Sequence, residues 1–78
     1  MILKKYVCTE IFEWDDKKKE YVRTVFTKRP YNGETNRELS HELCEMADIY
    51  DGSVQYKISI GTYTDDGKYC YSKFVYAI

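Results

Sequence analysis

The stretch TNRELSHELCEMADIY, residues 35–50, decides the fold because it predicts an amphipathic helix in a chain that otherwise reads as strands. Thr35 and Glu38 match a capping box, in which each side chain bonds the backbone N–H of the other residue. Apolar residues then recur at helical spacing, and Gly52 comes next as a residue that suits a helix end. We therefore expect a helix over residues 36–50 with one buried stripe. That stripe consists of Leu39, Leu43, Met46, Ala47 and Tyr50.

Toward the N-terminus, the chain has two strand-like runs joined by a charged segment. Residues 3–14 and 21–28 are rich in β-branched and aromatic side chains, which favour extended structure. Residues 15–20 are all charged and have nothing to bury, so they predict a loop. Together these segments predict a hairpin over residues 3–28.

Toward the C-terminus, the pattern predicts a second hairpin over residues 53–77. Apolar and polar residues alternate along 53–64, as they do in a strand with one buried face. Asp65-Asp66-Gly67 is a strong turn signal, and residues 68–77 then form the last strand.

Alternation also predicts the sheet face of each side chain. If Ile58 and Ile60 face the helix, the outward set is Lys57, Ser59, Tyr63, Tyr69, Tyr71 and Lys73, and the inward set on the last strand is Cys70, Phe74 and Tyr76. The first strand is ambiguous, because it has too many apolar residues for one face. One choice places Val7 and Ile11 outside, and the opposite choice exposes Tyr6, Cys8, Phe12 and Trp14. A bulge or a partner on the open face would accommodate either choice.

These elements predict the α+β class, with a two-layer ββαββ domain in which one helix covers one face of a four-stranded sheet. We expect residues 1–78 to form a single domain, because the chain is too short for two. The strand order that we favour is 2-1-4-3, which resembles the β-grasp arrangement of ubiquitin-like and immunoglobulin-binding bacterial domains. The all-antiparallel orders 2-1-3-4 and 1-2-4-3 are the alternatives.

Composition limits the classes of function. The chain has 12 basic and 13 acidic residues and a net charge of -1, which argues against general binding of nucleic acid through phosphates. No apolar run is long enough for a membrane span. Cys8, Cys44 and Cys70 lack a repeated spacing, so we expect free, mostly buried thiols and a cytoplasmic location.

The residues that could carry chemistry are few. His41 is the single histidine, and its helical neighbour Cys44 has no glycine-rich oxyanion loop beside it. The scattered cysteines lack the close pairs of a structural zinc site. We therefore expect no enzymatic activity, no bound metal and no cofactor.

Two surfaces are candidates for binding a protein. Four carboxylates form an acidic ridge beside the apolar stripe of the helix, and this ridge suits a partner with a basic surface. Its members are Glu38, Glu42, Glu45 and Asp48. Tyr63, Tyr69 and Tyr71 are predicted on the outer sheet face, where rigid aromatic side chains suit an interface. Self-association through that open face would make a homodimer.

In its small size, the acidic residues 38–48 and the tyrosine-bearing strands, the chain resembles the small phage-encoded inhibitors of bacterial defence, anti-CRISPR proteins above all. The resemblance implies a non-catalytic protein-binding module that blocks the surface of a nuclease or surveillance complex in the host cytoplasm. The near-neutral charge departs from the inhibitors that mimic DNA.

The alternative function is binding of nucleic acid through the sheet. Bases would stack on the tyrosines, as they do on single-strand binding proteins. The phosphate contacts would come from Arg23, Lys28, Arg29 and Arg37.

Overall fold

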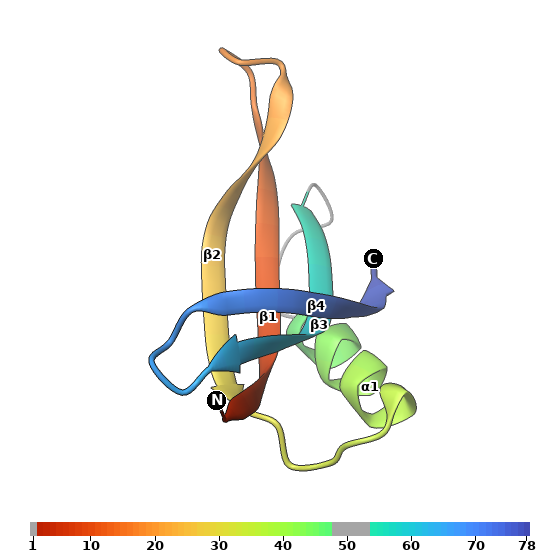
Figure 1. Ribbon diagram of the computed structural model, residues 1–78. Helices are drawn as coiled ribbons and strands as arrows, with labels where there is room; N and C mark the ends of the chain where they lie inside the picture. Colours follow the sequence, from red (N-terminus) through yellow and green to blue (C-terminus); the bar gives the residue numbers. More distant parts are fainter. Residues whose placement is uncertain (1, 48–53) are drawn as a thin grey trace.

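The computed structural model describes residues 2–47 and 54–78, and within them it contains the predicted order of elements (Figure 1). Strands β1 (Leu3–Asp15) and β2 (Glu20–Pro30) precede helix α1 (Asn36–Ala47), and strands β3 (Val54–Thr64) and β4 (Tyr69–Ala77) come after it. The α+β class and the ββαββ order are confirmed. The predicted last turn of the helix and the predicted start of the third strand at residue 53 lie outside the described residues.

The favoured strand order is wrong, and the sheet has the order β2-β1-β3-β4 with every pair antiparallel. The reason lies in β3, where both sets of alternating side chains are buried from Ile58 to Thr62. A strand with two buried faces belongs in the centre of a sheet. In β4 nearly every side chain is exposed, as befits an edge. The β-grasp resemblance, which required β4 beside β1, does not hold.

The core lies between α1 and the face of the sheet that β1, β3 and β4 form. The ladder sets Val7 opposite Ile60, Thr9 opposite Ile58, and Ile11 opposite Tyr56. Two helix residues of the predicted stripe are fully buried against this face, with Met46, Ala47 and Val75 packed around them. Those two residues are Leu39 and Leu43.

Of the two choices for the faces of the first strand, the structure has the second one. Val7 and Ile11 face the helix, so Tyr6, Cys8 and Phe12 lie on the other face, which we call the open face. A bulge, one of the two alternatives, is present in the β1–β2 ladder between Ile11 and Phe12, where Thr24 of β2 has no partner. An extra residue of this kind increases the local twist.

The predicted faces of β4 are partly wrong because the β3–β4 ladder is irregular at two places, between Thr62 and Tyr63 and between Ile58 and Ser59. Tyr76 pairs with Ile58 on the helix side, as expected. Tyr69 pairs with Tyr63 on the open face, as expected. Cys70 is then skipped, so Tyr71 pairs with Thr62 and Lys73 with Ile60 on the helix side. Two residues expected inward, Cys70 and Phe74, are exposed, and Phe74 lies on the open face opposite Ser59.

The two hairpin turns use residues in the left-handed backbone region. Gly67, the last residue of the predicted Asp65-Asp66-Gly67 turn, has φ of 90°, and the N–H of Thr64 bonds the carbonyl of Lys68 across the turn at 2.9 Å. In the β1–β2 turn Lys19 has φ of 57°. Its N–H bonds the carbonyl of Asp15 at 2.8 Å. Among the described residues, no helix is long and apolar enough to cross a membrane.

Candidate binding surface on the open sheet face

Aromatic side chains from all four strands lie on the open face. Because residues that pair across a ladder share a face, the register assigns each ring to it. The rings are Tyr6, Phe12, Trp14, Tyr21, Phe26, Tyr63, Tyr69 and Phe74. The most exposed are Phe74 at 59% and Tyr69 at 57%. An array of exposed rings on one face of a sheet is the kind of patch that marks an interaction surface.

Tyr63 lies at the centre of a ring cluster. Its ring packs edge-on against Tyr6 and against Tyr69, with both centroid separations at 5.6 Å. Lys28 places its Nζ over the rings of Tyr63 and Tyr6, at 4.3 and 4.8 Å from the centroids. Burial, and then the neighbouring Cys8, raise the pKa of Tyr63. The cluster therefore holds its rings in defined positions before any partner arrives.

Gly61 makes room for this cluster. A Cβ at this position would lie 2.9 Å from Cε1 of Tyr63 and 3.0 Å from Sγ of Cys8. The missing side chain lets the Tyr63 ring lie against the strand backbone. A lone glycine inside an alternating strand marks such a close approach, and it was the available sequence signal for this site.

The charged groups of the open face are largely paired with one another. Glu10, whose side chain is 14% exposed, contacts Arg23 at 3.2 Å and Lys57 at 4.0 Å. The guanidinium of Arg23 also lies 4.8 Å from the centroid of the Phe26 ring. Sequence reasoning missed Glu10 entirely, because only the ladder places it between two cations from different strands.

A hollow of about 440 Å³ lies in this face. Its lining comes from β1 and β2 on one side and from β3 and β4 on the other, which shows that the open face is concave. Figure 1 shows β4 crossing over β1 and β2, in agreement with this curvature. The lining includes Glu10, Arg23, Phe26, Tyr63 and Tyr69. A concave, aromatic surface can enclose a protruding group of a partner.

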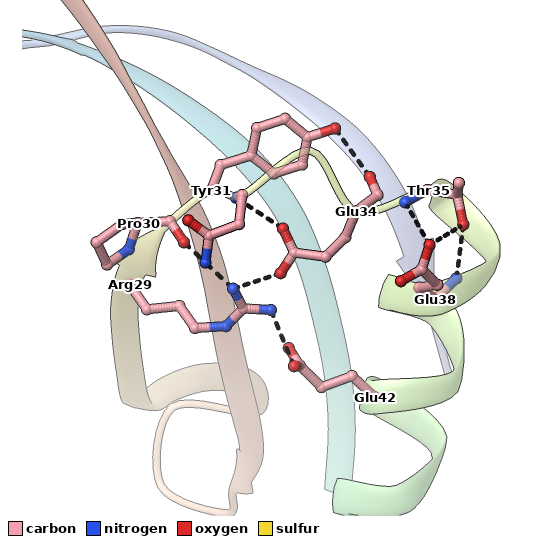
Figure 2. Close-up of polar contacts among 8 residues, drawn as sticks. Arg29, Pro30, Tyr31, Glu34, Thr35, Glu38 and Glu42 are labelled. Carbon is pink, nitrogen blue, oxygen red and sulfur yellow. Dashed lines mark hydrogen bonds and ion pairs between the residues drawn. The ribbon is translucent and has the colours of Figure 1, made fainter.

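The predicted acidic ridge is mostly engaged within the protein (Figure 2). Glu38 closes the capping box, since its Oε1 accepts the Thr35 N–H at 3.3 Å and its own N–H donates to Thr35 Oγ1 at 3.2 Å. Glu42 Oε1 lies 2.9 Å from Nη2 of Arg29. Glu45 lies 3.4 Å from Nδ1 of His41. Asp48, the fourth member, lies outside the described residues.

Arg29 joins β2 to the helix and to the segment between them. Its Nη1 contacts Glu34 at 2.6 Å and its Nη2 contacts Glu42 (Figure 2). Partial burial opposes ionisation of Arg29, but the two carboxylates outweigh it and raise its pKa. The Asn32 N–H, and then the N–H of Glu34 itself and the Arg29 side chain, lower the pKa of Glu34. This cluster serves to dock the helix.

The four cations proposed for nucleic acid do not form one surface. Arg23 and Lys28 lie on the open face, whereas Arg29 lies on the helix side and Arg37 is exposed on α1. Of the three predicted tyrosines, Tyr63 and Tyr69 lie together and Tyr71 does not.

The residues considered for chemistry also lie apart. His41 and Cys44 are exposed on α1, while Cys8 is buried under the open face. The expectation of mostly buried thiols is wrong, because Cys70 is exposed as well. Among residues 2–47 and 54–78, no three His, Cys, Asp or Glu side chains come together as a metal site.

Comparisons of the chain with protein-family models, with curated proteins and with solved structures found no match. The fold and the open face together define the class of protein. It is a small two-layer α+β domain in which a helix covers one face of the sheet. Its other face is concave and lined with aromatic rings.

Proposed function

We propose that this chain is a non-catalytic protein-binding domain and that the open sheet face is its binding surface. The observation that carries the proposal is the set of exposed rings on a rigid sheet, two of which, Tyr69 and Phe74, are more than half exposed. Aromatic side chains supply large contact areas at low entropic cost, and they are enriched among the residues that dominate binding energy.

The contacts that the cations of the open face already make within the chain favour a protein over a nucleic acid as the partner. Arg23 and Lys57 share Glu10, and Lys28 lies over two tyrosine rings. A phosphate backbone would have to displace these contacts to gain its own. Apolar side chains of a protein can cover the rings and leave the paired charges in place as a polar border.

The concave shape suggests how the partner binds. A protruding apolar or aromatic side chain of the partner would enter the hollow between Phe26 and Tyr69. Glu10, Arg23 and Lys57 in its lining offer hydrogen bonds to polar atoms that accompany that side chain. This gives the pocketed centre that most strong interfaces possess.

The acidic residues of α1 offer a second surface for a protein partner, but fewer observations support it. Docking onto a basic partner would use Glu45 and would compete with the Arg29 contact of Glu42. Such competition reduces the gain from every new ion pair. We therefore place the partner's main contact on the open face and leave the helix as a peripheral contact.

A finer proposal concerns the identity of the partner. If the likeness to small inhibitors of bacterial defence extends to function, the bound protein is a nuclease or surveillance complex, and binding blocks its surface. This proposal requires that the defence protein lose its activity when this chain is present. It also requires that the activity be retained when the open face of the chain is altered.

The test compares two double substitutions in affinity capture from the organism that encodes the chain. Tyr69→Ala with Phe74→Ala removes two open-face rings and should abolish capture of the partner. The control, Tyr71→Ala with Tyr76→Ala, removes two rings of similar exposure on the helix side and should retain capture. Far-UV circular dichroism confirms that both variants fold. Equal capture by both variants would refute the assignment of the surface.

Binding of single-stranded nucleic acid is the second candidate, and the specific observation for it is that Lys28 and Arg23 lie among the rings. Stacking on aromatic side chains contributes about 1–3 kcal/mol per base in such proteins. Fluorescence anisotropy with a labelled oligonucleotide tests it. A steep loss of affinity with salt, together with weakening by Lys28→Ala, would replace the first proposal.

A further inference from the structure

The two edges of the sheet differ in their protection against pairing with another strand. The β2 edge carries charged side chains, the bulge at Thr24 and Pro30 at its end. These are the devices that prevent edge strands from pairing. The β4 edge, residues 69–77, is irregular as well, because Cys70 and Val75 have no partner in the β3–β4 ladder, but it has no proline and a single charged residue, Lys73.

Four large apolar side chains are exposed on β4. Tyr71 and Tyr76 are 54% and 41% exposed on the helix side, although α1 packs closer to β4 than to the other strands. Tyr69 and Phe74 are exposed on the open face. Among the described residues, β3 is the only strand that is hydrogen-bonded to β4. The backbone groups on its other side therefore have no strand partner there.

We propose that β4 pairs antiparallel with β4 of a second copy of this chain, which makes a two-fold dimer with a continuous eight-stranded sheet. A second copy of the chain is the partner that gives a closed assembly. Pairing of β4 with the same strand is symmetric and stops at two chains, whereas pairing of β4 with β2 would continue without end. The charges and the proline of β2 oppose that second mode.

The sequence of β4 also selects a register for the self-pairing. With Ser72 on the two-fold axis, Lys73 lies opposite Tyr71 of the second copy. Both residues are on the helix side, where an ammonium group and a ring attract each other. Moving the two-fold axis from Ser72 to Lys73 would set Lys73 opposite its own copy, and like charges directly opposite destabilise a sheet. The Ser72 register avoids this repulsion.

Dimerisation would enlarge the open face in two ways. A two-fold axis perpendicular to the sheet keeps both open faces on the same side, so they join into one larger surface. The dimer would then present two hollows to a partner. The pairing itself uses the backbone edge of β4 and does not depend on the proposed function of the open face.

The first test is sedimentation of the unmodified chain across a dilution series, where we expect a dimer that dissociates on dilution. Ser72→Lys places two cations together at the axis and should weaken the dimer about tenfold. Thr24→Lys adds the same charge to the exposed β2 edge and should leave the dimer unchanged. A monomer at every concentration would overturn the proposal.

A cross-link gives a second, independent readout of the register. In a chain with Cys44→Ser and Cys70→Ser, we expect Ser72→Cys to form an intermolecular disulfide on treatment with diamide. Directly paired residues have Cα atoms about 4.5–5.5 Å apart, within the range that a disulfide spans. Thr24→Cys in the same background is the matched control. Equal cross-linking of the two variants would contradict pairing through β4.

Discussion

At the scale of single residues, Gly61 is the position where the absence of a side chain shapes the candidate surface. Its place against Tyr63 and Cys8 lets a ring cluster form in the middle of a sheet face. Because Gly61 is not among the residues with positive φ, its role is steric rather than conformational.

We predict that Gly61→Ala lowers the free energy of unfolding by about 1–3 kcal/mol, because the added methyl overpacks the cluster. Urea denaturation measures the change. In a Tyr63→Ala background the same substitution should cost clearly less, since the closest neighbour of the methyl is gone. An equal cost in both backgrounds would show that Tyr63 does not set the constraint.

Glu34 gives a prediction for pH. Its pKa in the folded protein is lowered from the usual 4.5, chiefly by the Asn32 N–H. The ionised form is therefore favoured by folding. The contribution of ionised Glu34 to the free energy of unfolding is complete above about pH 4.5, and it is lost as the pH falls through the pKa of Glu34 in the folded protein.

Glu34→Gln should consequently flatten the fall in stability below about pH 4.5, measured by urea denaturation at a series of pH values. Asp66 has a lowered pKa as well, through the hydroxyl of Thr64 and the Lys68 N–H, so part of the fall persists. NMR titration of the Glu34 carboxyl provides a direct check, and an ordinary pKa there would contradict its contacts with Asn32 and Arg29.

At the scale of elements, α1 depends on its first turn. The capping box satisfies backbone N–H groups that no helical bond can reach, and residues 29–34 dock that end of the helix onto β2. The hydroxyl of Tyr31 also donates to the Glu34 carbonyl at 2.8 Å (Figure 2). Local sequence and tertiary contacts thus stabilise the same helix start.

Thr35→Ala should lower the free energy of unfolding by about 1 kcal/mol, as loss of an N-cap does. Ser40→Ala is the control, because this exposed hydroxyl bonds a carbonyl within the helix and caps nothing. Thermal and urea denaturation of both variants measure the difference. A loss at Ser40 as large as that at Thr35 would argue against the cap.

At the scale of the whole molecule, the sheet divides the protein into a packed side and an open side. Both carry aromatic residues, but only the helix side has a second layer to bury them. Cys8 lies on the open side and is buried beneath the tyrosine cluster, whereas Cys44 and Cys70 are exposed.

The reaction rates of the three thiols should differ between the buried Cys8 and the two exposed cysteines. We expect Cys44 and Cys70 to react quickly with Ellman's reagent in the folded protein, and Cys8 to react only as fast as the molecule opens. Cys8→Ala should remove the slow phase and leave the fast phase unchanged. Three thiols reacting at one fast rate would contradict a closed tyrosine cluster.

The sequence by itself determined the elements, because capping, turn chemistry and hydrophobic period act over a few neighbouring residues. The capping box at Thr35, the stripe through Leu39 and Leu43, and the turn at Gly67 all arise from such local signals. The pairing of Tyr63 with Tyr69 was also predictable, since the turn sets the register next to it.

Tertiary structure decided the strand order, the faces of Tyr71, Lys73 and Phe74, and the partners of the acidic helix residues. A bulge inserts one residue and thereby reverses the face of the later residues in the strand, and no local pattern in this chain marks its position. The strand order depends on which strand can be buried on both sides, a property of the assembled layers. Glu42 meets Arg29, and Glu10 meets Arg23 and Lys57, only because folding brings separate segments together.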